Sequence, residues 1–167
     1  MSNPTTPKQR ALANLRFVRS INEKLFTGFP ENKEAFQGCP TDNHLAWTIG
    51  HLALSNAWFR SLVDGSKPDL PENFDALFGG KSTPKPDAKA YPALAELKRH
   101  YAQQFDKLLS AIEKTSDADL AKPCMSDSGG FASDRLEAAD RTAWHEGWHG
   151  GQVSSMRRAL GLARVMG

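Results

Sequence analysis

The chain has 167 residues, a formal net charge of +2, and 40% hydrophobic and 24% charged residues, an ordinary composition for a globular domain. Its length suits one domain with its own core, so we treat residues 1–167 as a single unit. The 21 Lys and Arg residues are spread along the chain, which argues against nucleic acid as a partner because a binder usually presents a basic stripe. No apolar run approaches the roughly 20 residues that cross a membrane.

The N-terminal residues and the two cysteines both bear on the cellular compartment. Residues 1–10 lack the apolar segment of a signal peptide. Cys39 and Cys124, each beside a proline, do not make a disulfide framework, and neither has the basic neighbourhood of a reactive thiolate. We therefore expect a reduced protein of the cytoplasm with two inert thiols.

Four segments carry apolar residues at the three- and four-residue steps of an α-helix. The first follows a loose polar arm at residues 1–7, and the second follows N-cap candidates at residues 40–43. The expected helices run from about 8 to 26, about 44 to 64, about 94 to 112 and about 134 to 160. No segment alternates with a period of two for long enough to predict a strand. The sequence therefore predicts an all-α fold, a four-helix bundle with at least one long crossover.

The longest expected connection, residues 65–92, joins the second and third helices. It is rich in proline and has one short apolar patch, at residues 74–78, that could form a single helical turn. A connection of this length is uncommon in a compact domain unless it covers something. A lid over a pocket and a plain crossover are both open, and we favour the crossover.

Two of the five histidines stand four residues apart in the last expected helix. Residues four apart lie about 40° round a helix axis and about 6 Å along it, so His145 and His149 project from one face and can share a metal ion. Gly147, Gly150 and Gly151 lie in the same stretch, where each glycine costs roughly 0.5–1 kcal/mol relative to alanine. The glycines indicate a close approach by another helix or a ligand, and a tight helix crossing without chemistry is the alternative.

A catalytic metal needs a third protein ligand, which in a bundle comes from another helix. The candidates are His44, His51 and His100. His44 and His51 are about 10.5 Å apart along a helix, so they cannot easily bind one ion together. His51 follows Gly50 among apolar residues and is the best candidate from its local context. A hydrogen-bonded core histidine is the alternative, with about equal support.

Residues 145–149 also match the HExxH signature of zinc proteases. The extended form of that signature needs a glycine and a histidine where this chain has Gln152 and Ser155. No Asp or Glu follows Glu146 that could act as a downstream ligand. No strand is predicted along which a peptide substrate could bind, so we reject the protease interpretation.

Segments of this sequence resemble the DinB-like (YfiT-like) family of metalloenzymes. Residues 47–52, WTIGHL, are similar to the family's mid-helix histidine in a W..GHL setting. Residues 145–161, HEGWHGGQVSSMRRALG, are similar to the family's HEAYHxGQ…RRxLG ending. Residues 115–120, TSDADL, match a common family phrase after the third helix. Order and spacing agree over nearly the whole chain.

The resemblance implies a bundle of the up-down-down-up type, often a homodimer. It implies a three-histidine site for zinc, nickel or a similar divalent ion between the second and fourth helices, with His51, His145 and His149 as ligands. Family members with known activities include S-transferases that use low-molecular-weight thiols. The resemblance therefore implies a metal-dependent transferase that joins such a thiol to a small electrophilic substrate, since three neutral imidazoles leave coordination positions open.

Two other functions remain open. A metal-dependent hydrolase would use metal-bound hydroxide as its nucleophile, with Glu146 as the tempting base. On a helix, Glu146 points about 100° away from His145, so we favour a solvated or salt-bridged glutamate. A metal-binding or dimerising module without chemistry is the third class, and absence of a pocket beside the histidines would favour it.

The polar and aromatic neighbours of the histidines have simpler expected roles. Gln152 could orient a ligand or form an inter-helix hydrogen bond, with about equal support for each. Trp47, Trp144 and Trp148 are expected in the core or in a pocket wall, because large aromatic side chains mostly serve packing.

Overall fold

The computed structural model describes residues 5–166 and is dominated by four long helices. These are α1 (Pro7–Leu25), α2 (Leu45–Asp64), α4 (Leu94–Lys114) and α6 (Arg135–Ala159). The shorter elements are α3 (Phe74–Phe78), the 3-10 turn η1 (Ala88–Ala90) and α5 (Asp117–Leu120). No strand occurs within residues 5–166, where an isolated bridge joins Pro123 and Asp134. The predicted all-α fold is confirmed.

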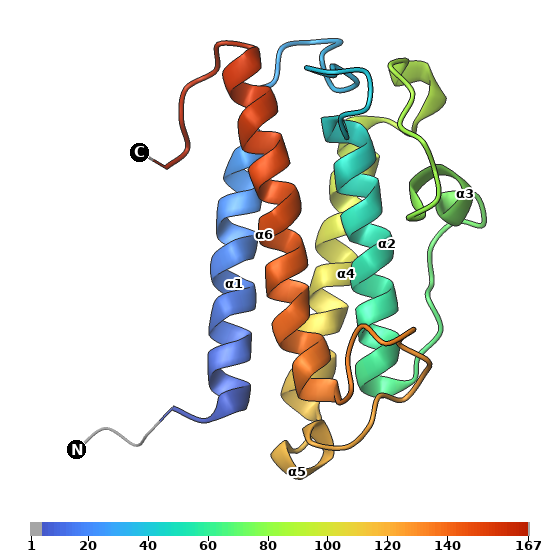
Figure 1. The fold of residues 1–167 in the computed structure, drawn as a ribbon, viewed down its shortest axis with the longest axis vertical. Coiled ribbons are helices and arrows are strands. Elements are labelled where there is room, and N and C mark those ends of the chain that lie inside the picture. Colours follow the sequence, from blue (N-terminus) through green and yellow to red (C-terminus); the bar gives the residue numbers. More distant parts are fainter. Residues whose placement is uncertain (1–4, 167) are drawn as a thin grey trace.

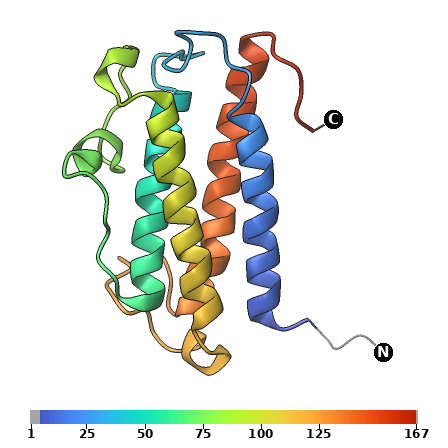
Figure 2. The same cartoon turned by 180° about the vertical axis from the view of Figure 1, so that it is seen from behind.

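The long helices form a bundle in which α1 and α6 run in one direction and α2 and α4 in the other (Figure 1). Seen from behind, α1 and α4 face the viewer and α2 and α6 lie beyond them (Figure 2). The main contacts are between α2 and α4, between α1 and α6, and between α2 and α6. The order of directions along the chain is therefore up-down-down-up. Because α2 and α4 are parallel neighbours, the segment that joins them must return along the length of the bundle.

Side chains cap the starts of three long helices. Thr6 and Gln9 form a capping box at α1, with Pro7 at the first helical position. Residues 6 and 7 therefore belong to the start of the helix and not to the loose arm predicted at 1–7, whose residues 1–4 lie outside the described part of the chain. At α6, Asp134 accepts a hydrogen bond from the backbone N–H of Glu137 at 2.7 Å.

The cap of α2 differs from the prediction. None of residues 40–43 caps this helix; the N-cap is His44, whose ring Nδ1 accepts a hydrogen bond from the backbone N–H of Trp47 at 3.2 Å. Its Nε2 lies 3.0 Å from the carbonyl oxygen of Lys85. Because a carbonyl only accepts, the ring is neutral with its proton on Nε2, which leaves Nδ1 free to cap.

The crossover between α2 and α4 lies against α2 over much of its length (Figure 1). Phe78 of α3 packs on Gly50, where a Cβ atom would overlap its ring. Asp69 pairs with Arg60 of α2 at 2.9 Å and with Lys107 of α4, and so ties the start of the crossover to both helices. The crossover thus serves as the predicted connection and also covers one face of α2.

The core is continuous through the bundle, and α2 is buried along nearly its whole length. The largest fully buried aromatic side chains come from α2, α3 and α4: Phe59, Phe74, Phe78, Tyr101 and Phe105. No helix between residues 5 and 166 is both long enough and apolar enough to cross a membrane.

Candidate metal centre

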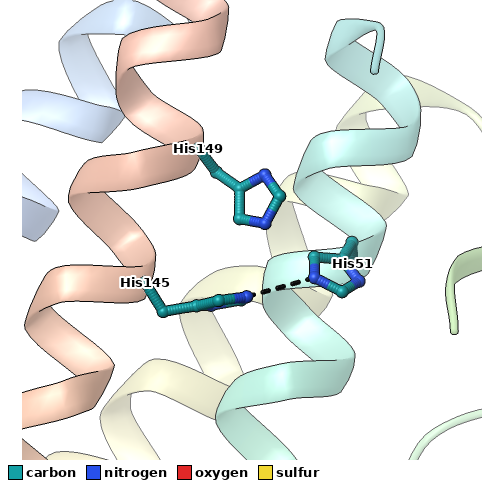
Figure 3. Close-up of side chains that lie close together, drawn as sticks. All are labelled: His51, His145 and His149. Carbon is teal, nitrogen blue, oxygen red and sulfur yellow. Dashed lines mark hydrogen bonds between the residues drawn. The ribbon is translucent and has the colours of Figure 1, made fainter. Parts of the chain in front are cut away.

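His51 on α2 and His145 and His149 on α6 point their rings toward one another across the gap between the two helices (Figure 3). Each ring contributes one nitrogen atom to the cluster, and these three nitrogens all lie within 4.8 Å of one another. Nε2 of His51 is 3.2 Å from Nε2 of His145. The structure therefore brings the three residues predicted as ligands into one cluster that could hold a metal ion.

The orientation of His51 is set by the crossover. Its Nδ1 lies 2.7 Å from the carbonyl oxygen of Phe78. Since that oxygen can only accept, Nδ1 carries the proton and Nε2 keeps a lone pair on the side of the cluster. The ring also stacks on Trp47, with centroids 4.6 Å apart and planes 9° from parallel. Two neighbours thus fix both the tautomer and the plane of this imidazole.

Gln152 orients His149 in the same way. Its Oε1 lies 2.9 Å from Nδ1 of His149 and accepts a second hydrogen bond, from Nδ2 of Asn43, at 3.2 Å. The proton of the His149 ring therefore sits on Nδ1, and Nε2 keeps its lone pair. Gln152 thus orients His149, one of the two roles predicted for it, and its bond to Asn43 joins α6 to the loop before α2 and not to another helix.

This geometry fits a divalent ion. Two imidazole nitrogens bound to a tetrahedral zinc at 2.0–2.1 Å are about 3.3 Å apart, close to the 3.2 Å between the Nε2 atoms of His51 and His145. The proton positions of His51 and His149 leave lone pairs that a cation can accept. Outer hydrogen bonds to the Nδ1 atoms of ligating histidines are the usual support of such a site. Imidazole donors suit zinc, nickel and copper rather than magnesium or calcium.

The electrostatics keep the rings neutral, as metal ligands must be. Burial lowers the pKa of His51 below its ordinary value. Burial, with a smaller contribution from the neighbouring histidines, lowers the pKa of His145 to about 3. Burial and the proximity of His51 lower the pKa of His149 to about 4. All three imidazoles are therefore available as neutral ligands at neutral pH.

The other two candidate ligands lie elsewhere. His44 is fully buried as the cap of α2. His100 on α4 packs its ring against Phe74 and lies 3.7 Å from a carboxylate oxygen of Glu96. Neither joins the cluster.

The predicted environment of Glu146, solvated or salt-bridged, is wrong. It is neither solvated nor paired with a base, because its side chain is fully buried among α1, α2 and α4. Oε2 accepts hydrogen bonds from Asn22 at 2.6 Å and from the hydroxyl of Tyr101 at 3.0 Å, and Oε1 accepts one from Asn56 at 2.8 Å. Burial raises the pKa of Glu146 to about 7, although these hydrogen bonds act in the opposite direction.

Only one of the three glycines in this part of α6 is closely approached. A Cβ atom at Gly150 would overlap Oδ1 of Asn22 on α1, whereas nothing lies within 4 Å of a Cβ atom at Gly147 or Gly151. Gly150 thus lets Asn22 reach α6, where its amide also donates to the backbone carbonyl of Glu146 at 3.1 Å. The close approach is an α1–α6 helix contact, which was the alternative without chemistry.

The three tryptophans do not share one environment. Trp47 is buried against His51, as predicted for a pocket or core residue. Trp144 and Trp148 are 57% and 58% exposed and contact each other in a tilted arrangement, with ring centroids 5.6 Å apart and planes 41° from parallel, so their predicted burial is wrong.

Two cavities lie near the histidines, but only the first is lined by members of the cluster. The first, which we call the apolar pocket, has a volume of about 380 Å³ and is bounded by His51 and His145. Its other walls come from α2, the crossover and the loop before α6: Leu54, Ser55, Trp58, Phe59, Pro68, Asp75, Gly79, Gly80 and Phe131. Part of the crossover therefore does line a pocket, as a lid would, while it connects two helices.

The second cavity, which we call the polar pocket, has a volume of about 460 Å³. Gln152 lines this pocket and also forms the hydrogen bond to His149. The remaining lining residues are mostly polar or small: Gly38, Cys39, Thr41, Asp42, Asn43, Ser155, Met156 and Ala159. The sequence did not predict either cavity, because each is walled by helix and loop residues that are distant in the chain.

Comparison with known proteins assigns the family. No curated protein matches the chain. The family model of the DinB superfamily matches residues 14–153, a span that contains His51, His145 and His149. This match covers well over half of the sequence and agrees with the resemblance found in its motifs. The chain belongs to the DinB superfamily.

Proposed function

We propose that this protein is a divalent-metal-dependent enzyme that transfers a low-molecular-weight thiol to a small electrophile. The observation that carries the proposal is the meeting of three neutral imidazoles, two of which line a pocket large enough for a small substrate. Zinc or nickel bound by His51, His145 and His149 would supply the positive charge that stabilises a thiolate at neutral pH.

The residues of the chain provide position and surroundings for this reaction. Phe78 and Gln152 hold the rings of His51 and His149 in the orientation that a ligand needs. The apolar pocket, which adjoins His51 and His145, would receive the electrophile. A thiolate held at the histidine cluster would then lie beside it, and such proximity lowers the entropic part of the barrier.

The proposed transfer is a simple substitution or addition. The thiol loses its proton to solvent, and the thiolate sulfur attacks the electrophilic carbon to form a C–S bond. In a substitution the leaving group departs with the electron pair of the broken bond. In an addition to an activated double bond, the displaced π electrons end on the neighbouring carbon, which takes a proton from water.

The structure gives less support to the two alternatives. A hydrolase with Glu146 as base would need that carboxylate beside the histidines, but its hydrogen bonds run to Asn22, Asn56 and Tyr101 and it has no exposed surface. Absence of a pocket beside the histidines would have favoured a module without chemistry, but the apolar pocket adjoins two of them.

Elemental analysis of purified protein tests the metal site first. We expect about one zinc or nickel per chain in the wild type, loss of the metal in His51→Ala, and retention in His100→Ala, a histidine outside the cluster. Metal-loaded protein is then incubated with glutathione, bacillithiol or mycothiol and a panel of electrophiles. A wild type that neither contains nor takes up metal refutes the metalloenzyme, and no conjugate with any thiol refutes the transferase.

The assembly and the compartment belong to the same proposal. A homodimer is expected, and sedimentation velocity at two protein concentrations would detect it. Cys39 and Cys124 are both free thiols, which is in keeping with the reducing cytoplasm.

A further inference from the structure

We infer that the electrophile of this enzyme is an uncharged aromatic molecule of roughly one substituted ring, bound in the apolar pocket. This inference rests on the proposed transferase function and adds the class of its second substrate. It is drawn from the shape, the chemistry and the charge of the pocket that adjoins His51 and His145.

The walls of the apolar pocket are aromatic. Trp58, Phe59 and Phe131 pack on one another with ring centroids 4.9 to 5.6 Å apart and interplanar angles of 52° to 70°. The ring of Phe59 continues to His145, with centroids 5.7 Å apart. A planar aromatic guest can add further edge-to-face or offset contacts to such a cluster, and each pair is worth about 0.5–1.5 kcal/mol beyond area burial.

The size of the pocket limits the guest. Its volume of about 380 Å³ lies near the lower end of the range for small-molecule sites, roughly 300–1,000 Å³. A substituted benzene fits this space. Leu54 and Pro68 close the pocket with aliphatic surface and add no hydrogen-bonding group.

The charge of the lining argues against an anionic guest. Among the residues that line the pocket in the described part of the chain, none is a lysine or arginine, and the ionisable carboxylate is that of exposed Asp75. Arg141 lies over the ring of Phe131, but it is engaged by the carbonyl of Phe131 and by Glu137. In the metal-free protein, a carboxylate or phosphate on the guest would therefore find no cationic side chain of the lining to pair with.

The reaction that follows is a nucleophilic aromatic substitution or a conjugate addition. With 1-chloro-2,4-dinitrobenzene, the thiolate forms a C–S bond to the ring carbon, the C–Cl bond breaks, and chloride leaves with its electron pair. Chloride and the thiol proton are the other products, so atoms and charge balance. The low-molecular-weight thiol is the one co-reactant, and no oxidant is needed.

Binding of two unreactive analogues tests the inference without turnover. Quenching of tryptophan fluorescence measures binding of 1,3-dinitrobenzene and of 3,5-dinitrobenzoate to metal-free protein, in which the carboxylate has no metal ion to bind. We expect the uncharged compound to bind at least about tenfold tighter than the anion, because the anion must bury an unpaired charge. Equal or tighter binding of the anion would overturn the inference.

Substitutions at the pocket extend the test. Phe131→Ala should weaken binding of 1,3-dinitrobenzene about two- to tenfold with zinc content unchanged. The matched control is Phe17→Ala, which removes a 63% exposed phenylalanine of α1 and should leave binding unchanged. Leu54→Arg places a cation in the lining and should shift the preference toward the anion. An effect of Phe131→Ala no larger than that of Phe17→Ala would contradict the assignment.

Turnover separates the two proposals. The zinc-loaded enzyme and a thiol should conjugate 1-chloro-2,4-dinitrobenzene faster than 4-chloro-3,5-dinitrobenzoate. Faster conjugation of the anionic electrophile would refute the inference and leave the transferase intact. Tight binding of 1,3-dinitrobenzene with no conjugation of any electrophile would refute the transferase and leave the aromatic specificity of the pocket standing.

Discussion

Glu146 should be among the side chains on which the stability of this fold depends most. Its carboxylate is the common acceptor for Asn22 of α1, Asn56 of α2 and Tyr101 of α4. One side chain of α6 is therefore hydrogen-bonded to all three of the other long helices. Glu146→Ala would leave three buried donors without an acceptor, together with a small cavity.

The magnitude follows from the number of stranded donors. Each buried donor left unsatisfied costs about 1–3 kcal/mol, and neighbouring effects are not additive. We therefore expect Glu146→Ala to lower the free energy of unfolding by about 3–6 kcal/mol, a large part of the 5–15 kcal/mol typical of a domain. Urea unfolding of metal-free protein, followed by circular dichroism, measures this loss.

Two further variants make the test sharp. Glu113→Ala removes an exposed carboxylate that pairs with Arg16, and it should cost less than about 1 kcal/mol. Glu146→Gln should cost less than Glu146→Ala, because Oδ1 of Asn56 has no partner and a turn of the Asn56 amide would let it accept from the new glutamine. A loss in Glu146→Ala as small as that in Glu113→Ala would refute the central role of this network.

Three other changes have defined outcomes. Gly150→Ala should destabilise the protein by about 1–3 kcal/mol in urea unfolding, since the new methyl group overlaps Asn22. Gly50→Ala should push Phe78 away and release the carbonyl that fixes the His51 ring. If His51 is a metal ligand as proposed, zinc binding should weaken about tenfold in a chelator competition assay. Burial lowers the pKa of His44 below its ordinary 6.5, so the stability from its neutral ring is present above that pH and is lost as the pH falls through the folded pKa. The free energy of unfolding of His44→Asn, relative to that of the wild type, should therefore rise as the pH falls from about 8 to about 5.5.

Two other glycines of α6 serve as controls for Gly150→Ala, and the pH dependence itself tests the prediction for His44. Gly147→Ala and Gly151→Ala meet nothing within 4 Å, so each should stabilise α6 by about 0.5–1 kcal/mol. If Gly150→Ala behaved like these two, the contact with Asn22 would not constrain the bundle. A pH-independent difference between His44→Asn and the wild type would contradict the assignment of a neutral capping ring.

The helices and the histidine pair could be predicted because their signals are local. Apolar residues at three- and four-residue steps indicate a helix without knowledge of its neighbours. The spacing of His145 and His149 places both rings on one face by helix geometry alone. The capping role of His44 was not predictable in the same way, since it depends on the carbonyl of Lys85, 41 residues away, which decides the tautomer.

The environment of Glu146 could not be read from its own position on the helix. Successive residues of a helix point about 100° apart, so a residue next to His145 was expected to face solvent. The expectation fails because α6 is enclosed on more than one side, by α2 at the histidines and by α1 and α4 at Glu146. The available signal was indirect. Asn56 lies in a mostly apolar stretch of α2, Asn22 lies on the apolar stripe of α1 with Val18 and Leu25, and buried polar groups of this kind need a partner.

The letters HExxH therefore have a different meaning in this chain from their meaning in a zinc protease. There, the glutamate and the two histidines act on the same substrate. Here His145 borders an accessible pocket, and the glutamate that follows it lies in a closed network with Asn22 and Asn56 on the other side. Because the clustered imidazoles and the structural carboxylate share one helix, α6 cannot rotate to improve one site without disrupting the other. The buried network thus fixes the direction in which His145 and His149 point.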